Sequence, residues 1–377
     1  MSRILYFIIT VAFLDTFIQL PIITPYAQEL GASLALTGGI VAVYSLTNMV
    51  GNIVGGHWID RYGRKKMLLT GMVAVTIILL FYPYAQTGEQ LFVIRFFHGL
   101  AGGVLIPAAF AYVGDLSSKA SRGKTMAYTG ACIGISAIIG PAVGGIMAAN
   151  SSIEYVFILV AILFLIAIVF IVKYIEETFV STERGKFNFK DFIPLLKHPL
   201  IIQASLGAFA LMVSNGTLAF ALPLKTEAMG LASDSTGLLL STFGIVALIV
   251  FLTPLNRIFD RFRPLILVIS GIVLVAVSLI LLSYTSSYMS SFIAMAIYGL
   301  GFAFVFPSMN SIVAEASSKV DRGKAYGIFY AFFSLGVVAG SSISGTVAQT
   351  LDEPFIVSAV IMLASSAFLL FFAKRKN

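Results

Sequence analysis

The most constraining feature of this sequence is a series of long apolar runs, each of about 20 residues or more. A helix needs about 20 apolar residues to cross a hydrocarbon layer roughly 30 Å thick, and a backbone in lipid must satisfy its own hydrogen bonds. The runs therefore predict membrane-spanning helices and not strands. Twelve spans are expected, over residues 4–26, 34–58, 67–86, 91–114, 124–148, 153–173, 199–223, 235–256, 264–285, 289–314, 324–349 and 354–373.

The composition favours an all-α membrane protein over a soluble one. Of the 377 residues, 59% are hydrophobic and only 11% are charged, whereas soluble domains carry about 25% charged residues. The first run lacks a small-residue cleavage site, so we interpret it as a span and not as a signal peptide. The single cysteine, Cys132, and three scattered histidines predict neither a disulfide framework nor a metal site. We expect no cofactor.

The basic residues indicate orientation. All 24 of them except Arg95 and Lys225 lie in the N-terminus, the C-terminus and alternate connections between the spans. Because cytoplasmic loops carry the excess of Lys and Arg, both termini are expected to be cytoplasmic, in an inner or plasma membrane. The net charge of +7 is therefore explained by basic residues that orient the chain in the membrane, and not by a nucleic-acid-binding surface.

An internal repeat relates the two halves of the chain. The segment Ser117–Lys124 recurs as Ser317–Lys324 at an offset of 200 residues. This repeat predicts two pseudo-symmetric six-helix bundles, 1–173 and 199–377, joined by a cytoplasmic loop over 174–198. Two bundles around an axis normal to the membrane can rock against each other and expose a central site alternately. A duplicated scaffold that moves nothing is the alternative. The same offset pairs Gly99 with Gly299, Pro107 with Pro307, Gly140 with Gly340 and Gly145 with Gly345.

Four motifs resemble one protein family. In Gly56–Lys66, Gly63 permits a tight turn and Asp60 can pair with Arg64, a spacing that a generic basic loop would not need. This segment resembles the loop signature of the major facilitator superfamily. The family is also matched, in order, by Arg95–Gly99, by the loop around Asp115 and Arg122, and by Gly140–Gly145. The last motif is similar to the pattern of the twelve-helix drug/proton antiporter branch, which exports.

The resemblance implies a conformational latch at the cytoplasmic ends of the spans. A charge network there would hold the halves together when the transporter opens outward. Simple control of topology is the alternative. The latch residues are Gly56, Asp60, Arg61, Gly63, Arg64, Asp115 and Arg122.

The antiporter motif in the fifth span consists of Gly140, Pro141, Gly144 and Gly145. Its glycines leave a groove that another helix can approach, and its proline removes one backbone hydrogen bond. Such a helix can bend and slide, although tight packing alone would explain the same residues.

Charges inside a membrane are costly and usually functional, so Asp15 in the first span and Arg95 in the fourth are the residues to explain. Asp15 lies about eleven residues into its helix, or roughly 16 Å deep. We hypothesise that Asp15 takes up and releases the coupling proton or contacts a cationic substrate, and that Arg95 biases its protonation. A structural ion pair, or an arginine that reaches the interface, is the alternative.

Further polar and aromatic residues within spans could line a substrate cavity with Asp15. Contacts between helices are the alternative explanation for each of them. The candidates are Gln19, Tyr44, Asn48, Asn215, Asn310, Tyr330 and Phe333.

The sequence shows no enzyme motif. Gly123-Lys124-Thr125 lacks the first glycine and the preceding strand of a phosphate-binding loop. We therefore expect a secondary active transporter driven by an ion gradient and not an enzyme. Its expected function is proton-coupled efflux of small amphipathic or lipophilic compounds by a monomer in the bilayer. The alternatives are export of a metabolite, siderophore, sugar or lipid, and proton-coupled import of a nutrient.

Overall fold

The computed structural model describes residues 2–116, 122–178, 193–316, 322–348 and 353–374, and in these the chain forms helices and no strand. Each predicted span corresponds to a helix, except the first, which corresponds to two helices on either side of a break. The helices are α1 (Ser2–Ile18), α2 (Ile23–Glu29), α3 (Leu34–Tyr62), α4 (Arg64–Leu79), α5 (Gly88–Leu116), α6 (Arg122–Asn150), α7 (Ile153–Tyr174), α8 (Ile193–Leu196), α9 (Pro199–Ala228), α10 (Ser233–Leu252), α11 (Ile258–Arg261), α12 (Pro264–Tyr284), α13 (Tyr288–Ala316), α14 (Arg322–Val347) and α15 (Glu353–Lys374), with 3-10 turns η1 (Tyr82–Tyr84) and η3 (Pro254–Arg257).

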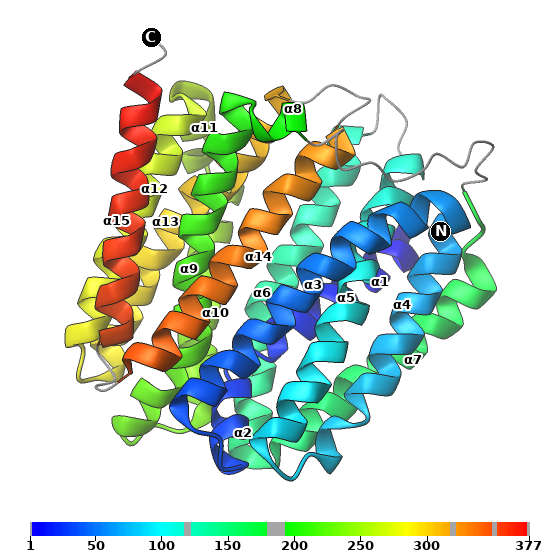
Figure 1. Cartoon of the computed structure of the whole chain (residues 1–377), viewed down its shortest axis with the longest axis horizontal. Coiled ribbons are helices and arrows are strands. Elements are labelled where there is room, and N and C mark those ends of the chain that lie inside the picture. Colours follow the sequence, from blue (N-terminus) through cyan, green and yellow to red (C-terminus); the bar gives the residue numbers. More distant parts are fainter. Residues whose placement is uncertain (1, 117–121, 179–192, 317–321, 349–352, 375–377) are drawn as a thin grey trace.

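The number of spans agrees with the sequence. Among the described residues, eleven helices are long and apolar enough to cross a membrane, and α1 with α2 makes a twelfth span that is bent by 48°. This confirms the predicted all-α membrane protein. An even number of crossings places the start of α1 and the end of α15 on one side, which we call the terminal side. The opposite side, where α2 lies, is called the distal side (Figure 1).

Pro21 explains the bend between α1 and α2. A proline has no N–H to donate to the carbonyl four residues earlier, and its ring clashes with that carbonyl. The carbonyl of Phe17 instead accepts from the N–H of Leu20, at 3.2 Å, and α1 ends at Ile18. The chain therefore turns directly after the helical turn that carries Asp15.

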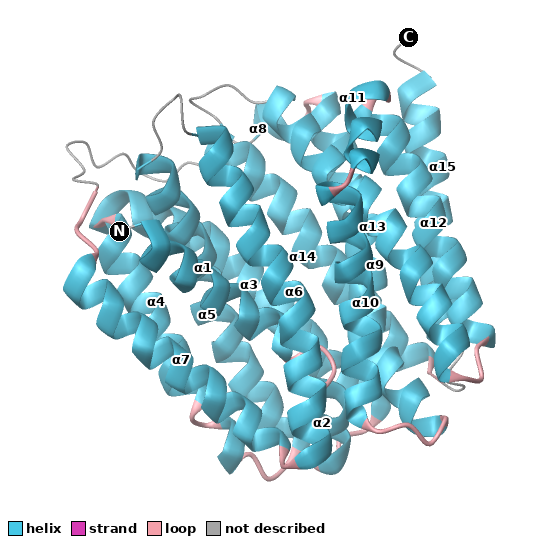
Figure 2. Ribbon diagram, turned by 180° about the vertical axis from the view of Figure 1, so that it is seen from behind, coloured by secondary structure: helices cyan, strands magenta, loops and turns pink. Residues whose placement is uncertain are grey.

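The repeat is visible in the helix boundaries. The bounds of α5 and α13 differ by 200 residues at both ends, as do those of α7 and α15. One apolar core is built from buried residues between Leu5 and Ile175, with Ala219, and a second from residues between Leu195 and Leu369. Figure 2 shows the same arrangement of helices from behind. Each half of the chain thus packs mainly against itself.

The two halves meet along two pairs of helices, α3 with α14 and α6 with α10. Where α3 begins and α14 ends, a Cβ atom on Gly38 would stand 2.9 Å from the Cα of Gly345. Where α6 ends and α10 begins, a Cβ atom on Gly145 would stand 3.1 Å from the Cα of Gly237. Both close approaches lie toward the distal side, so we call the two together the distal seam.

Candidate functional site

Asp15 lies in the last turn of α1 and is only 2% exposed. The amide of Gln19, just beyond the end of α1, donates both to the Oδ1 of Asp15 at 2.7 Å and to its backbone carbonyl at 2.9 Å. Gln19 therefore satisfies a carbonyl that the end of the helix leaves open and orients the carboxylate at the same time.

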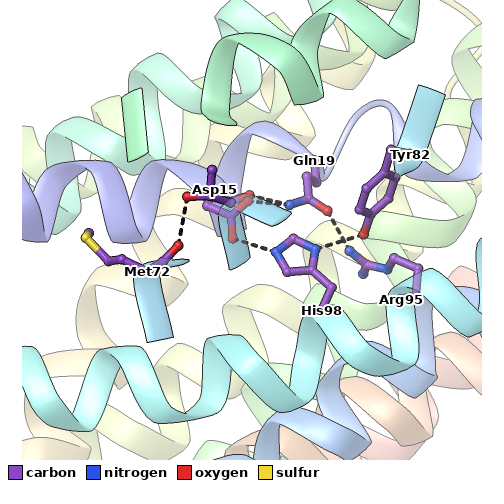
Figure 3. Close-up of polar contacts among 7 residues, drawn as sticks. Asp15, Gln19, Met72, Tyr82, Arg95 and His98 are labelled. Atoms are coloured by element: carbon purple, nitrogen blue, oxygen red, sulfur yellow. Dashed lines mark hydrogen bonds and ion pairs between the residues drawn. The ribbon is translucent and has the colours of Figure 1, made fainter. Parts of the chain in front are cut away.

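The second oxygen of Asp15 faces a histidine. The Nε2 of His98, in α5, lies 3.0 Å from the Oδ2 of Asp15, and its Nδ1 lies 2.8 Å from the hydroxyl of Tyr82 in η1. His98 and Tyr82 are both 0% exposed. The three side chains form a continuous polar row inside an apolar bundle (Figure 3).

Arg95 joins the same group through Gln19. The Nη1 of Arg95 donates to the Oε1 of Gln19 at 2.6 Å, and its Nε donates to the carbonyl of Ile40 at 3.3 Å. Its guanidinium carbon stands 4.2 Å from the centre of the Tyr44 ring. A planar cation held by two acceptors and an aromatic face is tightly oriented, and here it is 5% exposed.

Aromatic packing holds the row in place. The ring of Tyr82 stacks on Phe157 of α7, with centroids 3.9 Å apart. The hydroxyl of Tyr26 in α2 donates to the carbonyl of Tyr82 at 2.6 Å. The ring of Tyr44 meets His98 edge-on at 5.2 Å. Helices α1, α2, α3, α5 and α7 thus all contribute to the position of the polar row.

Asp15, Gln19, Tyr44 and Arg95, named from the sequence, therefore lie together. Their roles in coupling and substrate binding remain predictions. Sequence reasoning missed His98 as a site residue, although it stands one turn after Arg95 on the same face of a span. That spacing of two ionisable residues inside one span was the signal that could have identified it.

The second half carries a neutral counterpart of this group. At the repeat offset, Asn215 corresponds to Asp15, Met295 to Arg95 and Tyr298 to His98. The hydroxyl of Tyr298 pairs with that of Ser214 at 2.9 Å. Among these paired positions, the acid, the cation and the imidazole all belong to the first half.

The other substrate-binding candidates lie on several helices. On α3, Asn48 accepts a hydrogen bond from Asn52 at 2.8 Å. On α13, Asn310 donates to the carbonyl of Phe306 at 2.9 Å. On α14, the rings of Tyr330 and Phe333 lie 5.8 Å apart. These contacts are made within single helices, and substrate binding by these residues, as by Asn215, stays a prediction.

The predicted latch loop is held by a carboxylate that the sequence did not single out. Gly63 has φ of +104°, a conformation that favours glycine. Behind it, the carboxylate of Glu177, beyond the end of α7, accepts from the backbone N–H groups of Arg64, Lys65 and Lys66 at 2.8, 3.1 and 3.3 Å. The first turn of α4 is therefore capped by an anion, which the helix dipole favours. The side chains of Asp60, Arg61, Asp115 and Arg122, and the surroundings of Gly56, lie outside the described part of the structure.

The antiporter motif connects the polar row to the distal seam. A Cβ atom on Gly140 would stand 3.0 Å from the backbone nitrogen of Ile18, the last residue of α1. Gly144 lies against the same turn of α1, whereas Gly145 faces Gly237 of the other half. Pro141 lies inside α6 between these contacts. One short segment thus packs both on the helix that carries Asp15 and on the opposite half.

Known proteins resemble this chain over its whole length. The family model described as Major Facilitator Superfamily matches residues 5–212 and 204–377. Multidrug resistance protein 2 of Bacillus subtilis (strain 168) is 23% identical over 382 residues, which cover 98% of this chain and 94% of the relative. Quinolone resistance protein NorA of Staphylococcus aureus (strain MSSA476) is 24% identical over 378 residues, with 97% and 95% covered.

Solved structures show the same fold. The human organic anion transporter MFSD10 (TETRAN) superposes with a TM-score of 0.74 at 17% identity, covering 98% of each chain. A POT family transporter in complex with a thioalcohol conjugated peptide superposes with a TM-score of 0.82 at 15% identity, covering 99% of this chain and 96% of the other. With both halves matched in sequence and in fold, the chain belongs to the major facilitator superfamily of membrane transporters.

Proposed function

We propose that this protein exports small amphipathic compounds, lipophilic cations among them, in exchange for protons. The observation that carries the proposal is Asp15, a carboxyl group that is 2% exposed within a membrane span. Keeping such a group in a membrane is costly, so it persists where it serves a function. The relatives named for multidrug and quinolone resistance support an export function.

A single carboxyl group can exchange a proton for a cation. Ionised Asp15 attracts a positive charge, and in surroundings of low dielectric constant that attraction does not need an exact fit of shape. Protonated Asp15 loses this attraction and releases the cation. Because Gln19 contacts both Asp15 and Arg95, a change at the carboxyl group can reach the buried cation through this one side chain.

Alternating access would bring the site to the two membrane faces in turn. In our proposal, bundles 1–173 and 199–377 rock against each other so that the distal seam closes and opens in turn, with 174–198 as the connecting loop. The terminal side faces the cytoplasm, as the basic residues indicate. The motif on α6 supports this mechanism, because it packs against both α1 and the opposite half.

A cavity on the distal side supports cationic substrates. It has a volume of about 390 Å³ and lies between α2 and the connection from α9 to α10, with Glu29 and Glu227 in its lining. One carboxylate comes from each half of the chain. Two acidic groups in this cavity would attract positively charged compounds more than anions.

Transport by the purified protein in liposomes, with an imposed pH gradient and ethidium as the cationic probe, tests the proposal. We expect uphill ethidium movement that collapses when the gradient is removed, and its loss in Asp15→Asn. The matched control is Asp234→Asn, an acidic residue in the first turn of α10, which should transport as the wild type does. Movement of organic anions alone, or pH-driven ethidium movement by Asp15→Asn, would overturn the proposal.

A further inference from the structure

His98 is a fully buried titratable group that the proposed exchange at Asp15 does not by itself require. Both of its ring nitrogens have polar partners, Asp15 at Nε2 and Tyr82 at Nδ1, at 3.0 and 2.8 Å. Tyr44 meets the ring edge-on from α3, and Arg95 lies one turn earlier on α5. Among the residues that the structure describes, these are the titratable and charged groups that face the imidazole from the elements packed around it.

The geometry links the proton on Asp15 to the state of His98. Ionised Asp15 can only accept, so Nε2 must then carry a proton and donate it to Oδ2. When Oδ2 carries the proton, a neutral imidazole must accept at Nε2 and place its own proton on Nδ1. The Tyr82 hydroxyl can donate or accept, so it suits either state. When the imidazole starts neutral, with its proton on Nε2, a proton cannot settle on Oδ2 without a change at both ring nitrogens.

Adding one proton to this pair has two outcomes. It gives either a neutral carboxyl beside a neutral imidazole, or a carboxylate beside an imidazolium. In both outcomes a hydrogen bond joins the Nε2 of His98 to the Oδ2 of Asp15, which lie 3.0 Å apart. At this distance the two groups can therefore share the added proton, which can lie on either of them.

We infer that Asp15 and His98 together hold the transported proton, with His98 as the residue that sets the pH at which Asp15 loads and unloads. This inference deepens the proposed exchange and rests on it. Tyr82 keeps Nδ1 of His98 hydrogen-bonded in either tautomer, while Gln19 transmits the change in charge toward Arg95.

The repeat shows that the fold does not require an imidazole at this position. Tyr298 takes the place of His98 in the second half, and its ring meets Phe243 edge-on at 5.5 Å, much as His98 meets Tyr44. A tyrosine thus satisfies the same packing between the same pair of repeated helices. The histidine in the first half adds a second ring nitrogen that can take up and release a proton, which a tyrosine does not offer.

The experiment follows the pair directly in the full-length protein reconstituted in liposomes. Infrared spectroscopy with Asp15→Asn as the reference isolates the Asp15 carboxyl band. Nitrogen-15 spectra of labelled histidine, assigned with His98→Asn, follow the ring. We expect both signals to change over the same pH interval, and His98→Asn to move the pH midpoint of ethidium transport by about one unit or more.

Two further variants separate this role from a structural one. Tyr82→Phe keeps the stacking on Phe157 but removes the hydroxyl, so it should shift the same pH midpoint and change the histidine spectrum. It also serves as the test if His98→Asn does not fold. His198→Asn, which changes a histidine at the start of α9, should leave the pH profile unchanged.

An Asp15 band and a pH profile that stay unchanged in both His98→Asn and Tyr82→Phe would overturn the inference. Failure of the proposed exchange is recognised separately, because the wild-type protein would then move no ethidium in response to pH. The spectroscopic titrations need no transport. They therefore test whether Asp15 and His98 share a proton even if the protein moves no ethidium.

Discussion

Gly38 of α3 lies so close to Gly345 of α14 that a Cβ atom on Gly38 would stand 2.9 Å from the Cα of its partner. The same relationship joins Gly145 of α6 to Gly237 of α10 at 3.1 Å. Gly145 and Gly345 occupy equivalent positions in the repeat. Because helices in lipid approach closely only where side chains are small, both contacts of the distal seam depend on one residue type.

Gly38→Ala should therefore prevent the distal seam from closing fully. The added methyl group would meet the backbone of α14, with the carbonyl oxygen of Ser341 at 2.6 Å and Gly345 behind it. We expect a cost of about 1–3 kcal/mol to the closed form, and a several-fold slower exchange of ethidium. Initial transport rates and spin-label distances across the seam measure the two effects.

The neighbouring glycine provides the control. A Cβ atom on Gly39 would meet only the Phe92 ring, at an ordinary contact distance of 3.7 Å. Gly39→Ala should transport ethidium as the wild type does. Equal rates for the two variants would show that close approach at Gly38 is not needed for closure.

Glu177→Gln should weaken the cap at the start of α4. The amide keeps one acceptor oxygen for the N–H groups of Arg64 and its neighbours, but it loses the negative charge that the helix N-terminus favours. We expect a loss of about 1 kcal/mol in local stability. Hydrogen exchange of the Arg64, Lys65 and Lys66 amides should become roughly five times faster, by the usual conversion of free energy into an equilibrium constant.

Glu176→Gln is the matched control for this cap. At Glu176 it is the backbone carbonyl that accepts from Tyr112, at 2.7 Å, and this contact survives the substitution. Exchange at the start of α4 should then match that of the wild type. If Glu177→Gln also matched the wild type, the carboxylate would not be what stabilises the loop.

Arg95→Lys should impair transport although it conserves the charge. A lysine lacks the planar guanidinium that here reaches Gln19 and Ile40 while lying over the Tyr44 ring. We expect about a tenfold fall in the rate of ethidium transport, equivalent to roughly 1.4 kcal/mol.

Arg95→Met, which copies the residue at position 295, should lower the rate further, because it removes the charge as well. It also leaves the Gln19 oxygen without its donor. Wild-type rates in Arg95→Lys would show that the oriented guanidinium is dispensable.

Much of the architecture was predictable from local patterns. Span length is set by the thickness of the bilayer, and the repeat at an offset of 200 residues is visible in the sequence itself. Both could therefore be predicted without coordinates. The importance of Asp15 and Arg95 was also predictable, because charges inside a span are rare. The break at Pro21 was not anticipated, since the apolar run continues through it.

The polar row could not be derived in the same way. Asp15 and His98 are separated by 83 residues, and their contact depends on how α1 and α5 are rotated about their own axes. Hydropathy describes which segments enter the membrane, but lipid-facing and buried positions in these helices are both apolar, so it does not specify rotation. The same limit hid Glu177, whose partners lie 111 to 113 residues away.

By itself, the sequence determined that the chain crosses a membrane twelve times, in two related halves, because those properties follow from segment length and repetition. Only the tertiary structure decided which side chains meet. It joined Asp15 to His98 instead of pairing it directly with Arg95 through a hydrogen bond, and it set the glycines of α3 against those of α14. The physical reason is that packing depends on helix rotation and on sub-ångström fit between distant segments, neither of which is encoded locally.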